Sequence, residues 1–201
     1  MREGITTSEV VAARTAAERA LEAIRPWDDV EREHRADALA WVRGPQPIWR
    51  TRTPDEPPKH LVSYFVLVDP SARRCLLVDH RSAGLWLPSG GHVEVGEEPE
   101  VTVSRELDEE LGVELPLLDG LSTNPLFVTV TRTVDPVAGH TDVSLWFVCR
   151  AEVDVALAPD PAEFHGVRWW SLDELAGSDG RGFDPHLPRF STKLLAELGG
   201  P

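Results

Sequence analysis

The stretch Gly91–Val113, which reads GHVEVGEEPEVTVSRELDEELGV, decides the fold of this 201-residue chain. It predicts a loop, then a helix, then a stop. Pro99 suits a first helical turn because it has no N–H to leave unpaired there, and the acidic residues around it favour the positive end of the helix dipole. Gly112 supplies the C-terminal stop. We therefore expect a helix from about Pro99 to Gly112.

The expected helix has two different faces. At about 100° per residue, Glu106, Glu109 and Glu110 fall within one sector roughly 100° wide. The apolar side chains lie mostly on the far side, at Val101, Val103, Leu107 and Leu111. Like charges at these spacings repel unless a cation compensates them, and clustered carboxylates suit a hard ion such as Mg²⁺ or Mn²⁺. The alternative is a solvated acidic face, which is the usual explanation of a charge run.

The spacing of the whole stretch argues against that alternative. It resembles the signature of the Nudix hydrolases, G-x5-E-x7-R-E-U-x-E-E-x-G-U, in which U is a bulky aliphatic residue. The matching positions are Gly91, Glu97, Arg105, Glu106, Leu107, Glu109, Glu110, Gly112 and Val113. Chance agreement at all of them is on the order of one in a million from composition.

The resemblance implies a fold and a set of site residues. The fold is α/β, an α/β/α sandwich with a mixed β-sheet, here with an additional helical hairpin at the N-terminus. The implied metal ligands are Glu106, Glu109, Glu110 and the backbone carbonyl of Gly90. The implied catalytic residues are Glu97, Arg105, Glu106 and Glu109, with Arg105 paired to Glu97. The implied cofactor is Mg²⁺ or Mn²⁺.

Two parts of the implied site stay open. The general base is Glu106 or a carboxylate of a later loop, Asp160 or Glu163, although ordinary solvated charge also explains the last two. The stretch from Gly84 to Glu94 is similar to the family's W-x-L-P-G-G-x-x-E, but Ser89 is inserted before the glycine pair. Trp86 in that stretch either packs under the loop or stacks on substrate, and packing is favoured.

The segments before the Nudix-like region predict a separate addition. Residues 6–25 and 28–43 have helical periodicity, with capping boxes beginning at Thr6 and Asp28, so residues 1–44 form a helical hairpin. Residues 45–57 form a Pro-rich linker, and residues 58–201 form the Nudix domain. Trp49 either anchors the linker or stacks on a base, and anchoring is favoured. The hairpin docks on the domain, forms a dimer interface or covers the active site.

The remaining expected elements are five β-rich runs and two helices. The β-rich runs are His60–Val68, Cys75–Val78, Leu126–Val134, Asp142–Glu152 and Val167–Trp170, and the first four pair as two hairpins. A helix capped by Ser171 and a last helix from about Leu187 to Leu198 follow. His92 lies at a variable signature position. His140 and Asp142 flank a strand start, where they form a turn pair or contact substrate.

Composition limits the partners. The formal charge of −14 argues against a general nucleic-acid surface, which needs a basic patch. No run is long enough for a membrane span and the N-terminus lacks a signal peptide's apolar region, so a cytoplasmic protein is expected. Cys75 and Cys149 lie in apolar runs and are interpreted as small buried hydrophobic residues.

Three functions remain in competition. The first is a metal-dependent hydrolase that cleaves the diphosphate linkage of a nucleoside diphosphate derivative. The second is a Nudix-fold nucleotide-binding sensor or regulator without turnover, and the third is a structural cation-binding helix. The complete carboxylate set favours the hydrolase. The substrate stays open, and a homodimer is expected only from the resemblance.

Overall fold

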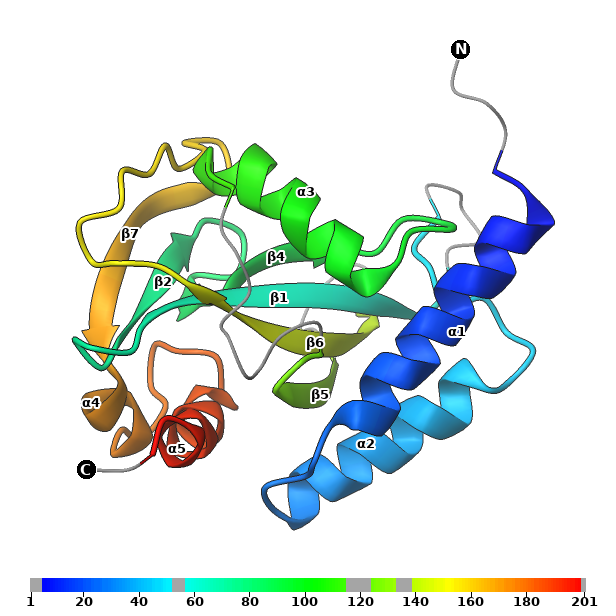
Figure 1. The fold of residues 1–201 in the computed structure, drawn as a ribbon, viewed down its shortest axis with the longest axis horizontal. Helices are drawn as coiled ribbons and strands as arrows, with labels where there is room; N and C mark the ends of the chain where they lie inside the picture. The colour runs from blue at the N-terminus through cyan, green and yellow to red at the C-terminus, as the bar shows by residue number, and fades with distance from the viewer. Residues whose placement is uncertain (1–4, 52–56, 115–123, 133–138, 200–201) are drawn as a thin grey trace. The chain divides into compact units, whose positions relative to one another are not determined.

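A computed structural model describes residues 5–51, 57–114, 124–132 and 139–199. The expected elements occur in their predicted order, and two short strands that were not expected lie between residues 85 and 92 (Figure 1). The helices are α1 Thr7–Ala23, α2 Asp29–Val42, α3 Pro99–Leu111, α4 Leu172–Ala176 and α5 Leu187–Glu197. The strands are β1 Lys59–Asp69, β2 Arg74–His80, β3 Leu85–Leu87, β4 Ser89–His92, β5 Phe127–Arg132, β6 Thr141–Arg150 and β7 Phe164–Ser171. Each described helix is too short or too polar to cross a bilayer.

The sheet links segments that are distant in the sequence. In the described part of the chain, neighbouring strands follow the order β3-β2-β1-β6-β5, while β4 also pairs with β1 and β7 with β2. Both expected hairpins are present as antiparallel pairs, with Val68 opposite Cys75 and Phe127 opposite Trp146. Residues 133–138, which include most of the second expected turn, lie outside the described ranges. The predicted fold class, an α/β fold with a mixed sheet and N-terminal helices, is confirmed.

Contacts within the chain divide it into two units. One unit comprises Met1–Tyr64, Gly91–Val103 and Thr123–Trp146, and the other comprises Phe65–Gly90, Ser104–Ser122 and Phe147–Pro201. The chain passes from one unit to the other within β1, α3 and β6 and at Gly90 in β4. The predicted domain boundaries therefore stay a prediction, and each unit is described by itself.

In the first unit, α1 and α2 form the expected helical hairpin, and α2 packs against β5 (Figure 1). Thr6 caps α1 in a full capping box with Glu9, as predicted. Asp28 caps α2 by accepting the N–H of Glu31, whereas the Glu31 carboxylate accepts the N–H of Trp27, one residue earlier than a capping box requires. The hairpin thus docks within its own unit.

The first part of the predicted linker is packed. The Arg14 guanidinium donates to the carbonyls of Val42, Gly44 and Gln46 at 2.7, 3.0 and 2.7 Å. It also lies over the Trp49 ring, 5.5 Å from its centroid, and Trp49 is buried. Trp49 therefore has the anchoring contact that was favoured over base stacking. Residues 52–56 of the linker lie outside the described ranges.

The second unit is held by β2, which pairs with β3 on one side and β7 on the other, and by α4 packed on α5. The β1–β2 turn depends on Asp69, whose carboxylate accepts from the Ser71 hydroxyl and the Ala72 N–H at 2.6 and 2.9 Å. Trp86 packs edge-on against Trp170 with ring centroids 5.4 Å apart, which is the packing role expected for it. Both cysteines are buried, and this burial raises each thiol's pKa to about 12.

One prediction about the signature loop is wrong. Gly91 and His92 belong to the short strand β4, not to a loop. The four residues of β4 include two glycines, which are depleted in strands and give no alternating pattern, so sequence periodicity does not reveal this strand. The consequence is that the signature begins on the sheet, directly beside the turn that leads into α3.

Candidate active site

The helix α3 forms as its sequence predicts. Pro99 is its first residue, and Gly112 ends it with φ of +65°. The N–H of Gly112 donates to the Asp108 carbonyl at 3.0 Å, and the N–H of Val113 donates back to the Leu107 carbonyl at 3.3 Å. This is the left-handed glycine stop that satisfies the last carbonyls of a helix.

The buried apolar residues of α3 are Val103, Leu107 and Leu111, whereas Val101 is 54% exposed. The prediction that Val101 packs with them is wrong. At about 100° per residue, Val101 lies about 160° around the helix from Val103, so the two cannot share a face. Glu110 lies only about 20° from Val103 on the same wheel, which places its carboxylate at the border of the apolar face.

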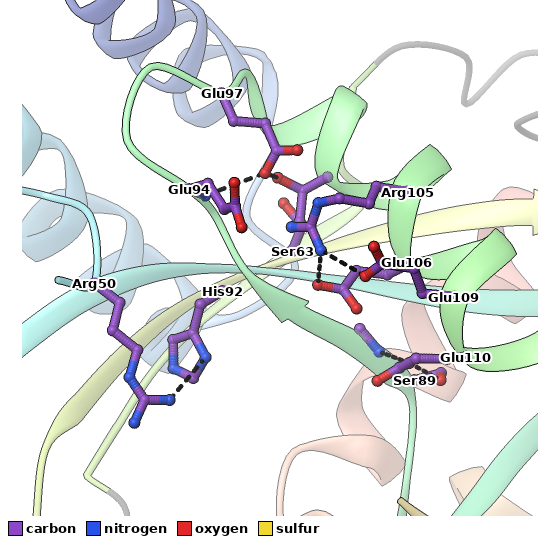
Figure 2. Close-up of polar contacts among 12 residues, drawn as sticks. Arg50, Ser63, Ser89, His92, Glu94, Glu97, Arg105, Glu106, Glu109 and Glu110 are labelled. Carbon is purple, nitrogen blue, oxygen red and sulfur yellow. Dashed lines mark hydrogen bonds and ion pairs between the residues drawn. The ribbon is translucent and has the colours of Figure 1, made fainter. Parts of the chain in front are cut away.

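Glu110 is held by Ser89 and Gly90, the two residues of β4 that precede the signature (Figure 2). Its carboxylate accepts a short hydrogen bond from the Ser89 hydroxyl and a second, at 3.0 Å, from the Gly90 N–H. Ser89 is buried, so the residue inserted before the glycine pair is a direct partner of the signature helix. Sequence reasoning did not assign it a role, and its only signal was its departure from the family pattern.

Burial raises the pKa of Glu110 to about 7. The hydrogen bonds from Ser89 and Gly90 oppose that shift, whereas the nearby charges of Glu106 and Glu163 add to it. A carboxyl group that is hard to ionise beside other carboxylates is typical of a site that takes up a cation. The donor set, oxygen only and clustered, fits a hard divalent ion.

Arg105 neutralises the other two carboxylates (Figure 2). Its Nη1 donates to Glu106 Oε1 at 2.6 Å and to Glu109 Oε2 at 3.1 Å. Glu106 is buried and Glu109 is exposed, so the pair extends from the protein interior to solvent. We use the name carboxylate cluster for Glu106, Glu109 and Glu110. Arg105 supplies one positive charge against three carboxylates, so the cluster keeps an excess of negative charge.

Glu97 holds the start of the same helix. Its Oε2 accepts from the Thr102 hydroxyl at 2.7 Å and from the Glu94 N–H at 3.1 Å. The Ser63 hydroxyl of β1 donates to the Pro99 carbonyl at 2.9 Å, which fixes the first turn to the sheet. Glu97 thus has an observed role in closing the signature loop. Its expected ion pair with Arg105 stays a prediction, as does metal ligation by the Gly90 carbonyl.

The loop before β7 reaches the end of α3. The N–H groups of Ala158 and Asp160 donate to the carbonyls of Leu111 and Glu110 at 2.8 and 2.9 Å. The Asp160 carboxylate accepts the N–H of Ala162 at 2.8 Å and so serves the turn itself. Glu163 lies near enough to raise the pKa of Glu110. Of the two loop carboxylates considered as general base, Glu163 is therefore the better placed.

Comparison with known proteins decides the family. The sequence model of the NUDIX domain family matches residues 58–190, about two thirds of the chain. The chain belongs to the Nudix family. It is a Nudix hydrolase, as its carboxylate signature predicted. A search of curated proteins found no match.

Solved structures agree with this assignment. A NUDIX-family hydrolase from Clostridium perfringens is 25% identical, covers 69% of this chain and 97% of its own, and has a TM-score of 0.52. The dihydroneopterin triphosphate pyrophosphohydrolase of E. coli is 14% identical, with 75% and 99% coverage and a TM-score of 0.55. The NUDIX domain of Shewanella oneidensis NrtR, solved with ADP ribose, is 21% identical, with 69% and 87% coverage and a TM-score of 0.50. The last two similarities concern the fold alone.

Proposed function

We propose that this Nudix hydrolase is metal-dependent and cleaves the diphosphate linkage of a nucleoside diphosphate derivative. The observation that carries the proposal is the carboxylate cluster, in which a half-buried Glu110 has a pKa raised to about 7 beside two further glutamates. Such a cluster is short of positive charge. A diphosphate substrate is also polyanionic, so the same cation that relieves the cluster attracts the substrate.

The residues of the cluster have distinct tasks in this proposal. Glu106, Glu109 and Glu110 hold Mg²⁺ or Mn²⁺, together with the Gly90 carbonyl. The bound ion supplies charge neutralisation for the phosphates and lowers the pKa of a water. Ser89 and the Gly90 N–H orient the Glu110 carboxylate, and Arg105 orients Glu106 and Glu109. Glu163 accepts the proton of the attacking water.

The test is product release from a panel of nucleoside triphosphates, nucleoside diphosphate sugars and dinucleotides, with Mg²⁺, Mn²⁺ or EDTA. We expect one substrate class to be cleaved only with metal, and Glu109→Gln to lower kcat by on the order of 100-fold because several kcal/mol of charge stabilisation depend on the ion. Asp108→Asn is the matched control, since Asp108 is the exposed neighbour on the same helix.

The outcomes separate the competing functions. Activity that survives EDTA, or that Glu109→Gln leaves unchanged, would contradict the proposal. No turnover across the panel, with a nucleotide still raising the melting temperature, would favour the nucleotide-binding sensor instead. Metal-dependent stability without any nucleotide effect would favour the structural cation site.

A further inference from the structure

A second group of ligand-type side chains lies in the first unit and includes none of the signature glutamates. We use the name histidine cluster for His60 in β1, His92 at the end of β4, and His140 and Asp142 at the start of β6. Each offers one ligand atom, and these four atoms lie within 4.8 Å of one another. The Nε2 atoms of His60, His140 and His92 are 3.1, 3.4 and 3.9 Å from the same oxygen, Oδ1 of Asp142.

Two buried polar atoms at the centre of the histidine cluster have no hydrogen-bond partner in the described part of the chain. His60 is fully buried, and Asp142 is buried as well. His60 Nε2 and Asp142 Oδ1 are 3.1 Å apart, yet neither atom makes a hydrogen bond within the described part of the chain. Buried polar atoms of native proteins are nearly always hydrogen-bonded, so this pair requires an explanation.

The hydrogen bond of the other ring nitrogen of His60 explains why Nε2 has no proton to donate. Its Nδ1 lies 3.3 Å from the Pro57 carbonyl, which can only accept a hydrogen bond. In the neutral ring the proton is therefore on Nδ1, and the lone pair of Nε2 faces Asp142 Oδ1. Two acceptors that face each other at this distance need a positive charge between them, which is either a second proton on the ring or a metal ion. A histidine that donates one ring N–H to a backbone carbonyl is also the usual arrangement at a metal ligand.

The spacing of the ligand atoms fits a small ion. A tetrahedral ion with bonds of about 2.0–2.1 Å has ligand atoms about 3.3 Å apart. The three distances to Asp142 Oδ1, from 3.1 to 3.9 Å, bracket that value. Imidazole-rich sites prefer Zn²⁺ and its transition-metal neighbours, whereas Mg²⁺ prefers oxygen. His92 and His140 are partly exposed, which leaves a path for the ion to enter.

We infer that His60, His92, His140 and Asp142 form a binding site for a Zn²⁺-type divalent ion, distinct in residues and in ion preference from the carboxylate cluster.

The contact between Arg50 and His92 must change when the ion binds. Arg50 Nη1 lies 3.2 Å from His92 Nδ1, which is then the acceptor nitrogen (Figure 2). Ligation through Nε2 moves the ring proton to Nδ1, so the exposed Arg50 side chain has to swing away.

The test measures metal binding to the full chain, without any activity assay. Protein stripped with a chelator is titrated with Co²⁺ or Zn²⁺ in excess Mg²⁺, which occupies oxygen-only sites. We expect one equivalent to bind, with the visible absorption of a four-coordinate Co²⁺ site. His140→Gln should weaken binding by about 100-fold or more, because a ligand is worth at least as much as the outer partners whose loss costs about 10–100-fold.

Control variants make either answer decisive. His165→Gln removes an exposed histidine of β7 and should bind the ion as the wild type does. Glu109→Gln should also retain the cobalt absorption, so that failure of the proposed hydrolysis is distinguishable from failure of this site. The inference is overturned if stripped wild-type protein takes up no Co²⁺ or Zn²⁺ in excess Mg²⁺. It is equally overturned if folded His140→Gln and Asp142→Asn, checked by circular dichroism, bind as tightly as His165→Gln.

Discussion

The carboxylate cluster and the histidine cluster bring ligands together in opposite ways. The three glutamates of the carboxylate cluster lie between positions 106 and 110 of one helix, so its geometry follows from helical periodicity. The histidine cluster joins positions 60, 92, 140 and 142, and it exists only after three strand segments have been assembled. The first therefore depends on local structure and prefers hard ions, whereas the second depends on the sheet and prefers softer ones.

The largest effect expected is on catalysis. Glu110→Gln removes one carboxylate of the carboxylate cluster while keeping the shape of the side chain, so we expect kcat to fall by on the order of 100-fold or more. Zn²⁺ binding at the histidine cluster should not change. Glu114→Gln, an exposed neighbour beyond the helix, is the control. Steady-state rates check the fall in kcat, and a parallel titration checks that Zn²⁺ binding is unchanged. A loss of Zn²⁺ binding would mean that the two clusters are not independent.

The next prediction uses a buried carboxylate that needs no cation. Asp69 accepts hydrogen bonds from Ser71, Ala72 and Val153, and the first two lead in holding its pKa below the ordinary value. A carboxyl group with a lowered pKa in the folded state stabilises the protein above its unfolded-state pKa, and this contribution is lost as pH falls through the folded-state pKa. Glu110, with its raised pKa, behaves in the opposite way.

We therefore expect Asp69→Asn to lower the free energy of unfolding by about 2 kcal/mol at pH 7, because charge-assisted hydrogen bonds are worth about 1.5–3 kcal/mol. The difference from wild type should shrink as the pH falls below about 4. Urea unfolding of both proteins at pH 7 and at pH 3.5 measures it. A difference that is constant with pH would show that the Asp69 charge has no part in the stability of the turn.

A smaller effect is expected at Ser89, which separates orientation of a ligand from the ligand itself. Ser89→Ala removes the hydroxyl that donates to Glu110 but leaves the Gly90 N–H in place. We expect activity to fall by about 10-fold, the lower end of the effect of losing an outer partner of a metal ligand. Raising the Mg²⁺ concentration should recover part of it. Ser89→Thr keeps the hydroxyl and should stay closer to wild type, and equal losses in both variants would contradict the orienting role.

The carboxylate cluster could be predicted from the sequence and the histidine cluster could not, because the first lies on one helix and the second is assembled from several strands. The spacing of Glu106, Glu109 and Glu110 identified the carboxylate cluster because periodicity is a property of one helix. Periodicity also accounts for the exposure of Val101, which lies about 160° around the helix from Val103. His60 carries no local signal, and the sequence predicts only a turn pair or a substrate contact for His140 and Asp142, since register between strands is set by tertiary packing. Ser89 was noticed only as an insertion.

The smallest effect tests how local the carboxylate cluster is. Gly112 has φ of +65°, and a Cβ there would meet the Ala158 Cβ at 3.0 Å. Gly112→Ala should cost about 1 kcal/mol, because an L side chain is disfavoured in this conformation and the loop at Ala158 has to give way. In a chain of this size that lowers the melting temperature by about 2–4 °C. Because the Ala158 loop also bonds the end of α3, the strain falls on the helix end nearest Glu110. Activity should therefore drop a few-fold while Zn²⁺ affinity is unchanged, and the reverse pattern would show that the helix end supports the sheet more than the carboxylate cluster.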